Sequence, residues 1–586
     1  MNIMPLKTRL VWIIFAVMTV ALFTFFLWHE PINWGGDIVE YYGTSESLLN
    51  HGTPNLTAKD QHNLEQILNP VYFDMKGYYI TGTDGARYPV HFIFYSILLI
   101  PFRLILQITG QSEIKTLVLT NVAILIGTAL YFLRYSTLNS FQKTLLLLGL
   151  FLSPFVYFIA WPGPDLLYLC TMLFSIYFFS QKKYLASALS ATIASWHSQP
   201  LLIYALGMLG FYITHIVHMH YDSEEKHITM RLHSLQLSHL LQVIFILGLL
   251  FLPYLYNLIV FGVLSPWEIL QDFWTEYYGF GLHNASIKKL FEQLFDLNIG
   301  LFWYLPVLFV GGGYALIKKS VYAVSYRLLS VLIVLTAIGY QTNPAWHYGT
   351  AGYGPTRHAI FILPILLLFF VKNIKPTFKY MLVIGAFVLT QLWVFSFNGW
   401  LTPNLLNVLS NNPYATFVLN KYPWIYNPTP EIFVDRTNHT DKDYPTSAFY
   451  LNNDLCTKAY VLRHERGKAI ETCGYIPQKY LKEFEQSKEL KDIDKERTVK
   501  TTQALLLPRA YGCDKTFEPV YGQNYACLKT LEDVVSYTGI TDVARIRPIE
   551  DIKGAWGLKF GRPQTITVPP GYGIEYYSFE GVYVDY

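Results

Sequence analysis

The amino-acid sequence predicts an all-α polytopic membrane domain of about 11 transmembrane helices, followed by a C-terminal α+β domain outside the membrane. The 586 residues are 52% hydrophobic and only 15% charged, with a mean hydropathy of +0.27, whereas soluble domains carry about 25% charged residues. The charges are also unevenly distributed, since residues 1–397 hold 40 of them and 398–586 hold 45. This composition excludes an ordinary cytosolic enzyme, a disordered protein and a nucleic-acid-binding protein.

The first apolar segment lies close to the N-terminus. Lys7 and Arg9 precede an uninterrupted apolar run from Leu10 to Trp28 that lacks a small-residue cleavage site. We interpret it as an uncleaved first span and not as a signal peptide. Further apolar stretches cover residues 88–108, 115–133, 144–160, 165–180, 184–197, 199–217, 240–262, 299–317, 324–341, 358–371 and 380–397.

The stretch at 88–108 decides the topology. If it crossed the membrane, the basic connectors at Lys182/Lys183, Lys318/Lys319 and Lys372/Lys375/Lys379 would all fall outside. If it lies along the outer interface, all short basic connectors fall inside. The inner side then holds 14 Lys/Arg and 3 Asp/Glu, while the outer loops hold 8 Lys/Arg and 15 Asp/Glu. Since cytoplasmic loops are enriched in Lys and Arg, and Arg103 after Pro101 suits an interfacial helix, the sequence predicts eleven spans. The N-terminus is then cytoplasmic, and the membrane domain covers 1–397, including the external loop 31–88.

Cysteine usage agrees with an exported C-terminal domain. Four of the five cysteines lie within 398–586, and an even set in an exported domain predicts disulfides. The simplest of the three pairings joins Cys456 to Cys473 and Cys513 to Cys527, and the alternative is a set of reduced, buried thiols. Lys479–Lys500 has the charge pattern of a solvated helix. Strands are expected at Ala504–Leu507, Thr565–Val568 and Tyr576–Val584.

Two acidic residues stand out at the outer ends of the apolar segments. Asp37 opens a stretch with helical spacing that includes Glu40 and Tyr41 and stops at Gly52, which predicts a short amphipathic helix on the membrane surface. Asp165 follows Pro164 at the start of the next outward-facing helix. Each acid has an alternative interpretation as an N-cap. Because both belong to the same membrane face, we interpret them as a candidate catalytic pair.

Other polar side chains belong to the same face. Cations beside acids and aromatic rings suit a substrate with a phosphate and a sugar, since Arg pairs with phosphate oxygens and carboxylates accept hydroxyl protons. Polar residues at outward-facing span ends also predict a binding cleft. The candidate substrate-binding residues are Glu40, Tyr41, Arg87, His197, Asn257, His347 and Arg357.

Five motifs, in order, resemble those of the integral-membrane GT-C glycosyltransferases, closest to the branch of bacterial protein O-mannosyltransferases and the lipid A aminoarabinose transferase. The resemblance covers 1–397. The motifs are Gly36-Asp37 with Tyr41-Tyr42 and Gly52; Arg87-Tyr-Pro89; Ser153-Pro154 with Pro164-Asp165; Tyr256-Asn257 and Phe261-Gly262 with Leu294–Pro306; and Trp346–Gly349 with Gly354–Arg357.

This resemblance implies transfer of a sugar from a polyprenyl-phosphate donor to a hydroxyl of a glycan, lipid or protein, usually with inversion. The reaction would occur on the extracytoplasmic face of a bacterial inner or plasma membrane, among membrane lipids and without nucleic acid. It further implies that Asp37 is the base, that Asp165 is the second active-site carboxylate, and that Arg87 and Arg357 hold the donor phosphate.

The sequence departs from the family pattern at two positions. Ile38, and not a second acid, follows Asp37, and Thr356 separates Pro355 from Arg357. With one Asp per loop there are few ligands for a divalent metal, so we expect a reaction without a metal or other cofactor, and a divalent metal is the alternative. Two alternatives to an enzyme remain at this stage. One is a transporter or flippase of lipid-linked sugars, and the other is a non-catalytic subunit of an envelope glycan assembly system.

Overall fold

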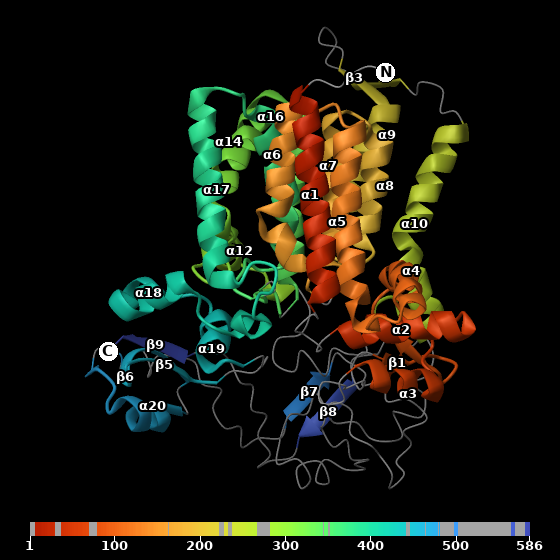
Figure 1. Ribbon diagram of the computed structural model, residues 1–586. Coiled ribbons are helices and arrows are strands. Elements are labelled where there is room, and N and C mark those ends of the chain that lie inside the picture. Colours follow the sequence, from red (N-terminus) through yellow and green to blue (C-terminus); the bar gives the residue numbers. More distant parts are fainter. Residues whose placement is uncertain are drawn as a thin grey trace.

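A computed structural model gives the structure of the chain (Figure 1). It describes residues 6–29, 37–68, 79–161, 163–221, 228–231, 237–266, 282–343, 345–349, 352–440, 446–462, 465–478, 480, 497–501, 564–568 and 581–585. The described part is mostly helical, with 19 α-helices and small antiparallel sheets.

Five helices are long and apolar enough to cross a membrane. Their apolar windows cover Val11–Trp28, Glu113–Tyr135, Leu237–Phe261, Val324–Gln341 and Phe378–Asn398. Many of their large hydrophobic side chains face outward, as is typical of surfaces that contact lipid. The sequence composition and the five long apolar helices therefore both indicate an integral membrane protein.

These five helices belong to a larger bundle of apolar helices that run roughly side by side (Figure 1). Its members are α1 (Leu6–Trp28), α5 (Thr116–Tyr135), α6 (Ser140–Phe151), α7 (Asp165–Ser180), α8 (Tyr184–Ser195), α9 (Leu201–Ile216), α10 (Leu237–Phe261), α14 (Pro306–Tyr322), α15 (Val324–Gln341), α16 (Leu363–Asn373) and α17 (Phe378–Asn398). One continuous core of buried Leu, Ile, Val and Phe side chains joins them. Several are shorter than the roughly 20 residues that a perpendicular crossing requires.

Layers of shorter elements lie at one end of the bundle (Figure 1). The first loop contributes α2 (Ile38–His51), α3 (Ala58–Ile67), the hairpin β1 (Tyr79–Thr81) and β2 (Arg87–Pro89), and α4 (Phe94–Thr109). Gly52 ends α2 in the left-handed conformation, with φ +73°, where the sequence predicts the stop. The β3 (His218–Tyr221) and β4 (Ile228–Arg231) hairpin lies at the opposite end of the bundle.

A buried arginine holds α4 against this layer and does not face lipid. The Arg103 side chain is fully buried, forms ion pairs with Glu46 of α2 and with Glu113 (2.7 Å), and donates to the carbonyl oxygen of Tyr42 (3.1 Å). At 16 residues, and with its only charge paired inside the protein, α4 packs on α2 and α5. The interfacial position of α4 stays a prediction, because a charged residue of a membrane-spanning helix is also paired inside the protein.

The remaining elements follow α10 and α17. They are α12 (Ile287–Phe295), α13 (Leu301–Tyr304), α18 (Pro413–Lys421), α19 (Pro430–Asn438), α20 (Arg466–Cys473), the three-stranded sheet β5 (Ala448–Asn452), β6 (Leu455–Leu462) and β9 (Gly581–Asp585), and the pair β7 (Arg497–Thr501) and β8 (Gln564–Val568). Short 3₁₀ segments cover Glu113–Lys115, Pro154–Phe158, Leu282–Asn284, Ile360–Ile362, Leu405–Leu409 and Pro423–Ile425.

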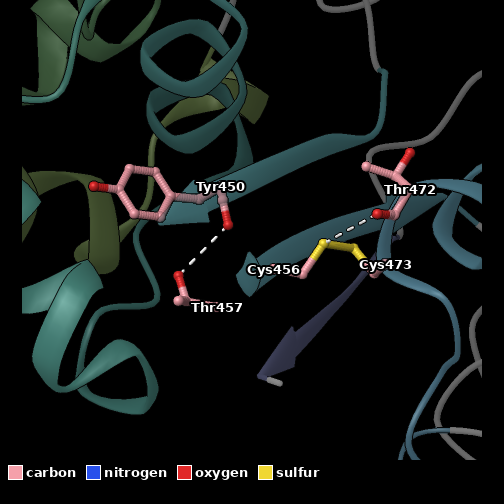
Figure 2. Close-up of a disulfide and its surroundings, with 5 residues drawn as sticks. All are labelled: Tyr450, Cys456, Thr457, Thr472 and Cys473. Carbon is pink, nitrogen blue, oxygen red and sulfur yellow. Dashed lines mark hydrogen bonds between the residues drawn. A yellow bond between two sulfur atoms is a disulfide. The ribbon is translucent and has the colours of Figure 1, made fainter. Parts of the chain in front are cut away.

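A disulfide joins Cys456 in β6 to Cys473 at the end of α20, with a Cα–Cα distance of 5.4 Å (Figure 2). It is the first of the two pairings expected from the sequence. Cys513 and Cys527 lie outside the described residues, and Cys170 is buried and free. Beside the disulfide, Thr457 donates to the carbonyl oxygen of Tyr450 (3.5 Å) and links the two strands of the β5–β6 hairpin.

The expected C-terminal elements compare unevenly with the structure. The strands β8 and β9 overlap the expected strands at Thr565–Val568 and Tyr576–Val584. The expected helix over Lys479–Lys500 is wrong at its end, because Arg497–Thr501 pairs with β8 as a strand. Alternating charges are compatible with a solvated strand as well as with a solvated helix, and here β pairing decides. The expected strand at Ala504–Leu507 lies outside the described residues.

Candidate functional site

Asp37 precedes the first residue of α2, yet its side chain does not cap that helix. The residue has φ −60° and ψ −10°, which is helical backbone, and makes no side-chain capping hydrogen bond. A capping aspartate has extended backbone and accepts from an N–H of the first turn. Asp37 therefore occupies the N-cap position without capping the helix through its side chain, and the half-buried residue remains available for another role.

Asp165 is the first residue of α7, and Pro164 occupies the N-cap position. The N-cap interpretation is therefore wrong for Asp165. The residue is only 6% exposed, and the N-terminal end of a helix stabilises such a carboxylate. Gly163 makes room for it, because a Cβ atom at Gly163 would lie 2.9 Å from Asp165 Oδ2 and 3.3 Å from the Trp161 ring.

Arg357 lies in the loop that leads into α16. Its backbone N–H donates to the carbonyl oxygen of Tyr348 (3.0 Å), and its own carbonyl oxygen accepts from the hydroxyl of Tyr168 (3.1 Å) on α7. The half-buried guanidinium lies over the ring of Trp161, 5.9 Å from its centroid. Among the described residues, it forms no ion pair within 4 Å.

The charges of these three residues act on one another. Burial lowers the pKa of Arg357, but the nearby carboxylates of Asp165 and Asp37 outweigh burial and raise this pKa above its ordinary value. Asp37 and Asp165 are also close enough for electrostatic interaction with each other. The structure thus brings together two acids from different helices and one arginine from a third segment.

Thr356, the residue that separates Pro355 from Arg357, anchors this loop. Its backbone N–H donates to the carbonyl oxygen of Ile299 (2.8 Å), and its hydroxyl donates to that of Trp346 (2.8 Å). Thr356 and Trp346 are fully buried. The additional residue therefore fixes the backbone from which the Arg357 side chain extends.

Glu40 and Tyr41 occupy the first turn of α2. Glu40 is 1% exposed and accepts two hydrogen bonds from His91, one from Nδ1 (2.7 Å) and one from the backbone N–H. The Tyr41 ring lies 5.1 Å from that of Tyr95 and 5.8 Å from that of His91. The Tyr41 ring is placed among the charged groups, whereas Glu40 faces His91.

A chain of hydrogen bonds runs from Tyr95, the ring neighbour of Tyr41, through Asn121. The Tyr95 hydroxyl donates to Asn121 Oδ1 (2.7 Å), and Asn121 Nδ2 donates to the carbonyl oxygens of Phe158 (3.1 Å) and Ile159 (3.2 Å). Asn121 is fully buried in α5. It therefore links α4 to the segment that carries Asp165.

The sequence does not distinguish His91 and Tyr95 as site residues. The motif Arg87-Tyr-Pro89 lies just before His91, but nothing local distinguishes this histidine, since its partner Glu40 is 51 residues away. Burial lowers the pKa of His91, but the charge of Glu40 outweighs it, so that the pKa is about 9. Asp37 raises the same pKa and Arg357 lowers it, so His91 belongs to the same group of charges.

His197 lies at the edge of this group. Its ring is 6.0 Å from that of Tyr95, and neither ring nitrogen, both inaccessible to solvent, has a hydrogen-bond partner among the described residues. Burial, with a smaller effect of His91, lowers the pKa of His197 to about 3. It is therefore a neutral imidazole next to the charged residues.

Two other predicted site residues, Arg87 and Asn257, lie in β2 and α10. Arg87 is in β2, where it pairs with Thr81 and its carbonyl oxygen accepts from the N–H of Leu56 (2.8 Å). Asn257 of α10 donates to the carbonyl oxygen of Leu264 (3.1 Å) and holds the turn after that helix. A substrate-binding role of either residue stays a prediction.

The third of the remaining predicted site residues, His347, contacts α19. Its Nδ1 lies 3.6 Å from the carboxylate of Asp435 in α19, and its carbonyl oxygen accepts from Arg436 (3.3 Å). Burial, then Arg436, lowers the pKa of His347 well below its ordinary value. This neutral histidine joins the Arg357 loop to α19.

The donor set of the site contains two acids and an arginine. No group of three or more His, Cys, Asp or Glu side chains among the described residues has the arrangement of metal ligands. An arginine interacts with both acids, and such a cation competes with a metal ion for carboxylates. The arrangement is suited to binding an anion next to a carboxylate base.

No family model, no curated protein and no solved structure matches this chain.

Proposed function

We propose that the protein is a membrane glycosyltransferase that transfers a sugar from a polyprenyl-phosphate donor to an acceptor hydroxyl. One observation carries the proposal: Asp37, Asp165 and Arg357, each brought by a different segment, interact electrostatically at one end of an apolar helical bundle. The resemblance of five ordered motifs to GT-C glycosyltransferases supports the same reaction.

The chemistry requires a base and a cation. In the proposed reaction, Asp37 accepts the proton of the acceptor hydroxyl while the hydroxyl oxygen forms a bond to the anomeric carbon. The bond between that carbon and the phosphate oxygen breaks on the opposite side, which inverts the configuration. Arg357, which has no ion pair within 4 Å among the described residues, stabilises the charge on the departing phosphate.

We further propose that the helical bundle crosses the membrane eleven times and that the site faces the extracytoplasmic side. Basic residues gather at the ends of helices remote from Asp37. Lys372 Nζ donates to Ser180 Oγ (2.8 Å), and Lys143 Nζ donates to the carbonyl oxygen of Leu133 (2.6 Å). These contacts join the basic ends of α5, α6, α7 and α16, as the positive-inside rule expects of a cytoplasmic face.

The central test is the Asp37→Asn substitution, because an amide has the shape of the carboxylate but cannot accept the proton. We expect it to reduce transfer from a labelled polyprenyl-phosphate sugar by at least roughly 100-fold, the usual contribution of a general base. Purified protein in lipid nanodiscs would be assayed with and without EDTA. Glu65→Gln is the matched control, since Glu65 is an exposed acid of α3 in the same layer.

Each alternative predicts a different outcome. Movement of the lipid-linked sugar across a vesicle membrane without turnover would indicate a transporter, and neither movement nor transfer would indicate a non-catalytic subunit. Full transfer by Asp37→Asn would contradict the proposed base. Loss of transfer in EDTA, restored by a divalent cation, would contradict the metal-free form of the proposal.

A further inference from the structure

The Glu40–His91 pair has a geometry that orients an imidazole. Glu40 Oε2 accepts from His91 Nδ1 at 2.7 Å, and Glu40 Oε1 accepts from the backbone N–H of the same residue. Both oxygens of one buried carboxylate thus hold one histidine. Because the two nitrogens of an imidazole lie at opposite edges of the ring, Nε2 is directed away from Glu40.

His91 differs from a histidine that serves only to fill a core. Its side chain is 23% exposed, while that of Glu40 is 1% exposed. The ring lies 5.8 Å from that of Tyr41, which occupies the turn that begins at Asp37. The carboxylate is therefore on the protein side of the pair, and the imidazole is on the accessible side, next to the proposed base.

Binding of an anionic ligand at this site requires more positive charge than Arg357 alone supplies. Asp37, Asp165 and Glu40 contribute three carboxylates, whereas Arg357 contributes a single guanidinium. A protonated His91 offsets the charge of Glu40, with which it is hydrogen-bonded. Its charge also interacts with Asp37 and with Arg357. Two cations, one from β2–α4 and one from the loop before α16, thus lie in the same group of charges.

We propose that His91, held by Glu40, is the second cation that binds the phosphate of the lipid-linked donor, together with Arg357. This inference rests on the proposed function, and it names a substrate-contacting residue that the motifs do not contain. Glu40 then acts as a positioning residue and does not itself contact the substrate. A histidine that hydrogen-bonds a phosphate oxygen as a cation contributes more than a neutral donor does.

The experiment measures binding of a radiolabelled polyprenyl monophosphate to the full-length protein in nanodiscs. We expect His91→Gln to weaken binding roughly 10- to 100-fold, which is the range for a charge-assisted hydrogen bond. We expect His91→Lys to restore part of the affinity, because it restores the charge. The corresponding polyprenol, which lacks the phosphate, should bind the wild type and His91→Gln equally.

The pH profile provides a readout that a merely structural role would not change. The groups that act on His91 are Glu40 and Asp37 from α2, with Tyr41 beside it, Arg357 from its loop and His197 from the α8–α9 turn. Since the pKa of His91 is about 9, wild-type binding should decline as the pH rises through that value. His91→Lys should retain binding to a higher pH, because a lysine has an ordinary pKa of about 10.4.

His62→Gln is the matched control, since His62 is exposed on α3 of the same layer, and its binding of the monophosphate should equal that of the wild type. Wild-type affinity in a folded His91→Gln protein would overturn the inference, and so would equal losses for the monophosphate and the polyprenol. If His91→Gln binds the monophosphate as the wild type does, and the wild type transfers sugar, the proposed function stands without the inference. If His91-dependent binding occurs without transfer, the inference stands and the proposed function fails.

Discussion

Gly163 shows how one missing side chain shapes the candidate site. It lies between Trp161, whose ring is beneath the Arg357 guanidinium, and Asp165. A Cβ atom here would be 2.9 Å from Asp165 Oδ2, which is closer than a carbon and an oxygen normally approach. The carboxylate would have to move, and its interaction with Arg357 would change.

We therefore expect Gly163→Ala to lower the turnover rate of sugar transfer roughly 10- to 100-fold, because displacements of about 1 Å have effects of that size. The amount of folded protein should not change, as judged by size-exclusion chromatography. Gly127→Ala is the control, since nothing lies within 4 Å of the added Cβ in α5. Unchanged turnover in Gly163→Ala would show that the position of Asp165 is not critical.

The sequence identified the two acids of the candidate site better than the residues that interact with them. Asp37 and Asp165 attract attention because each is a charge at the end of an apolar stretch. The alternative capping role could be tested only with backbone geometry. Asp37 occupies the N-cap position of α2 but makes no side-chain capping hydrogen bond, and Pro164 occupies the N-cap position of α7 in place of Asp165. The Glu40–His91 pair was out of reach, because residues 51 positions apart meet only through the packing of α2 against α4.

Among the secondary-structure elements, α12 combines a short amphipathic helix with a buried acid. Glu292 Oε1 accepts from the backbone N–H of Thr429 (2.7 Å), while Oε2 is buried with no hydrogen-bond partner among the described residues. Burial, and then the charge of Asp296, raises the pKa of Glu292 to about 8. In the folded protein this acid therefore keeps its proton at pH values where the unfolded chain has lost it.

The sign of the pH effect follows from proton binding. Between its ordinary pKa of 4.5 and about 8, Glu292 binds more protons in the folded state than in the unfolded state, so stability falls as the pH rises through that interval. We expect Glu292→Gln, which stays neutral, to lose at least about 1.4 kcal/mol less than the wild type between pH 5 and pH 8, the equivalent of one pKa unit.

Thermal unfolding in detergent at the two pH values would measure this difference, with Glu65→Gln as the control for the loss of an exposed acid. Parallel stability curves for wild type and Glu292→Gln would contradict a protonated Glu292.

Hydrophobic periodicity predicts some helices of the structure and misses the ends of others. It places α2 correctly, but 144–160 divides into α6 and a 3₁₀ segment because Pro154 prevents the preceding residue, Ser153, from adopting helical backbone.

For the whole molecule, the central prediction is that the two ends of the bundle lie on opposite sides of a membrane. Lys182 follows α7 at the end where Ser180 contacts Lys372, and Asp84 lies at the tip of the β1–β2 hairpin in the layer of α2. A cysteine introduced at Asp84 should react with a membrane-impermeant maleimide in intact cells. A cysteine at Lys182 should react only after the membrane is permeabilised.

The parent chain, carrying its own cysteines, provides the background for both labelling reactions. Labelling of the Lys182→Cys protein in intact cells would place both ends of the bundle outside and contradict the eleven-span topology. The helical architecture of residues 1–397 could largely be anticipated from their apolar stretches, whereas the side of the membrane on which each basic connector lies stays a prediction. What could not be anticipated is which external segments touch, as the contact of His347 with Asp435 illustrates.

The buried position of Arg103 also has a consequence for biogenesis. During synthesis, the translocon encounters α4 as a strongly apolar segment before Glu46 and Glu113 can pair with the arginine. An arginine at the centre of a helix opposes insertion by about 2.5 to 3.5 kcal/mol. If α4 did insert, every later helix would enter with the opposite orientation. If the eleven-span topology holds, we therefore expect this one side chain to help determine the orientation in which the later helices insert.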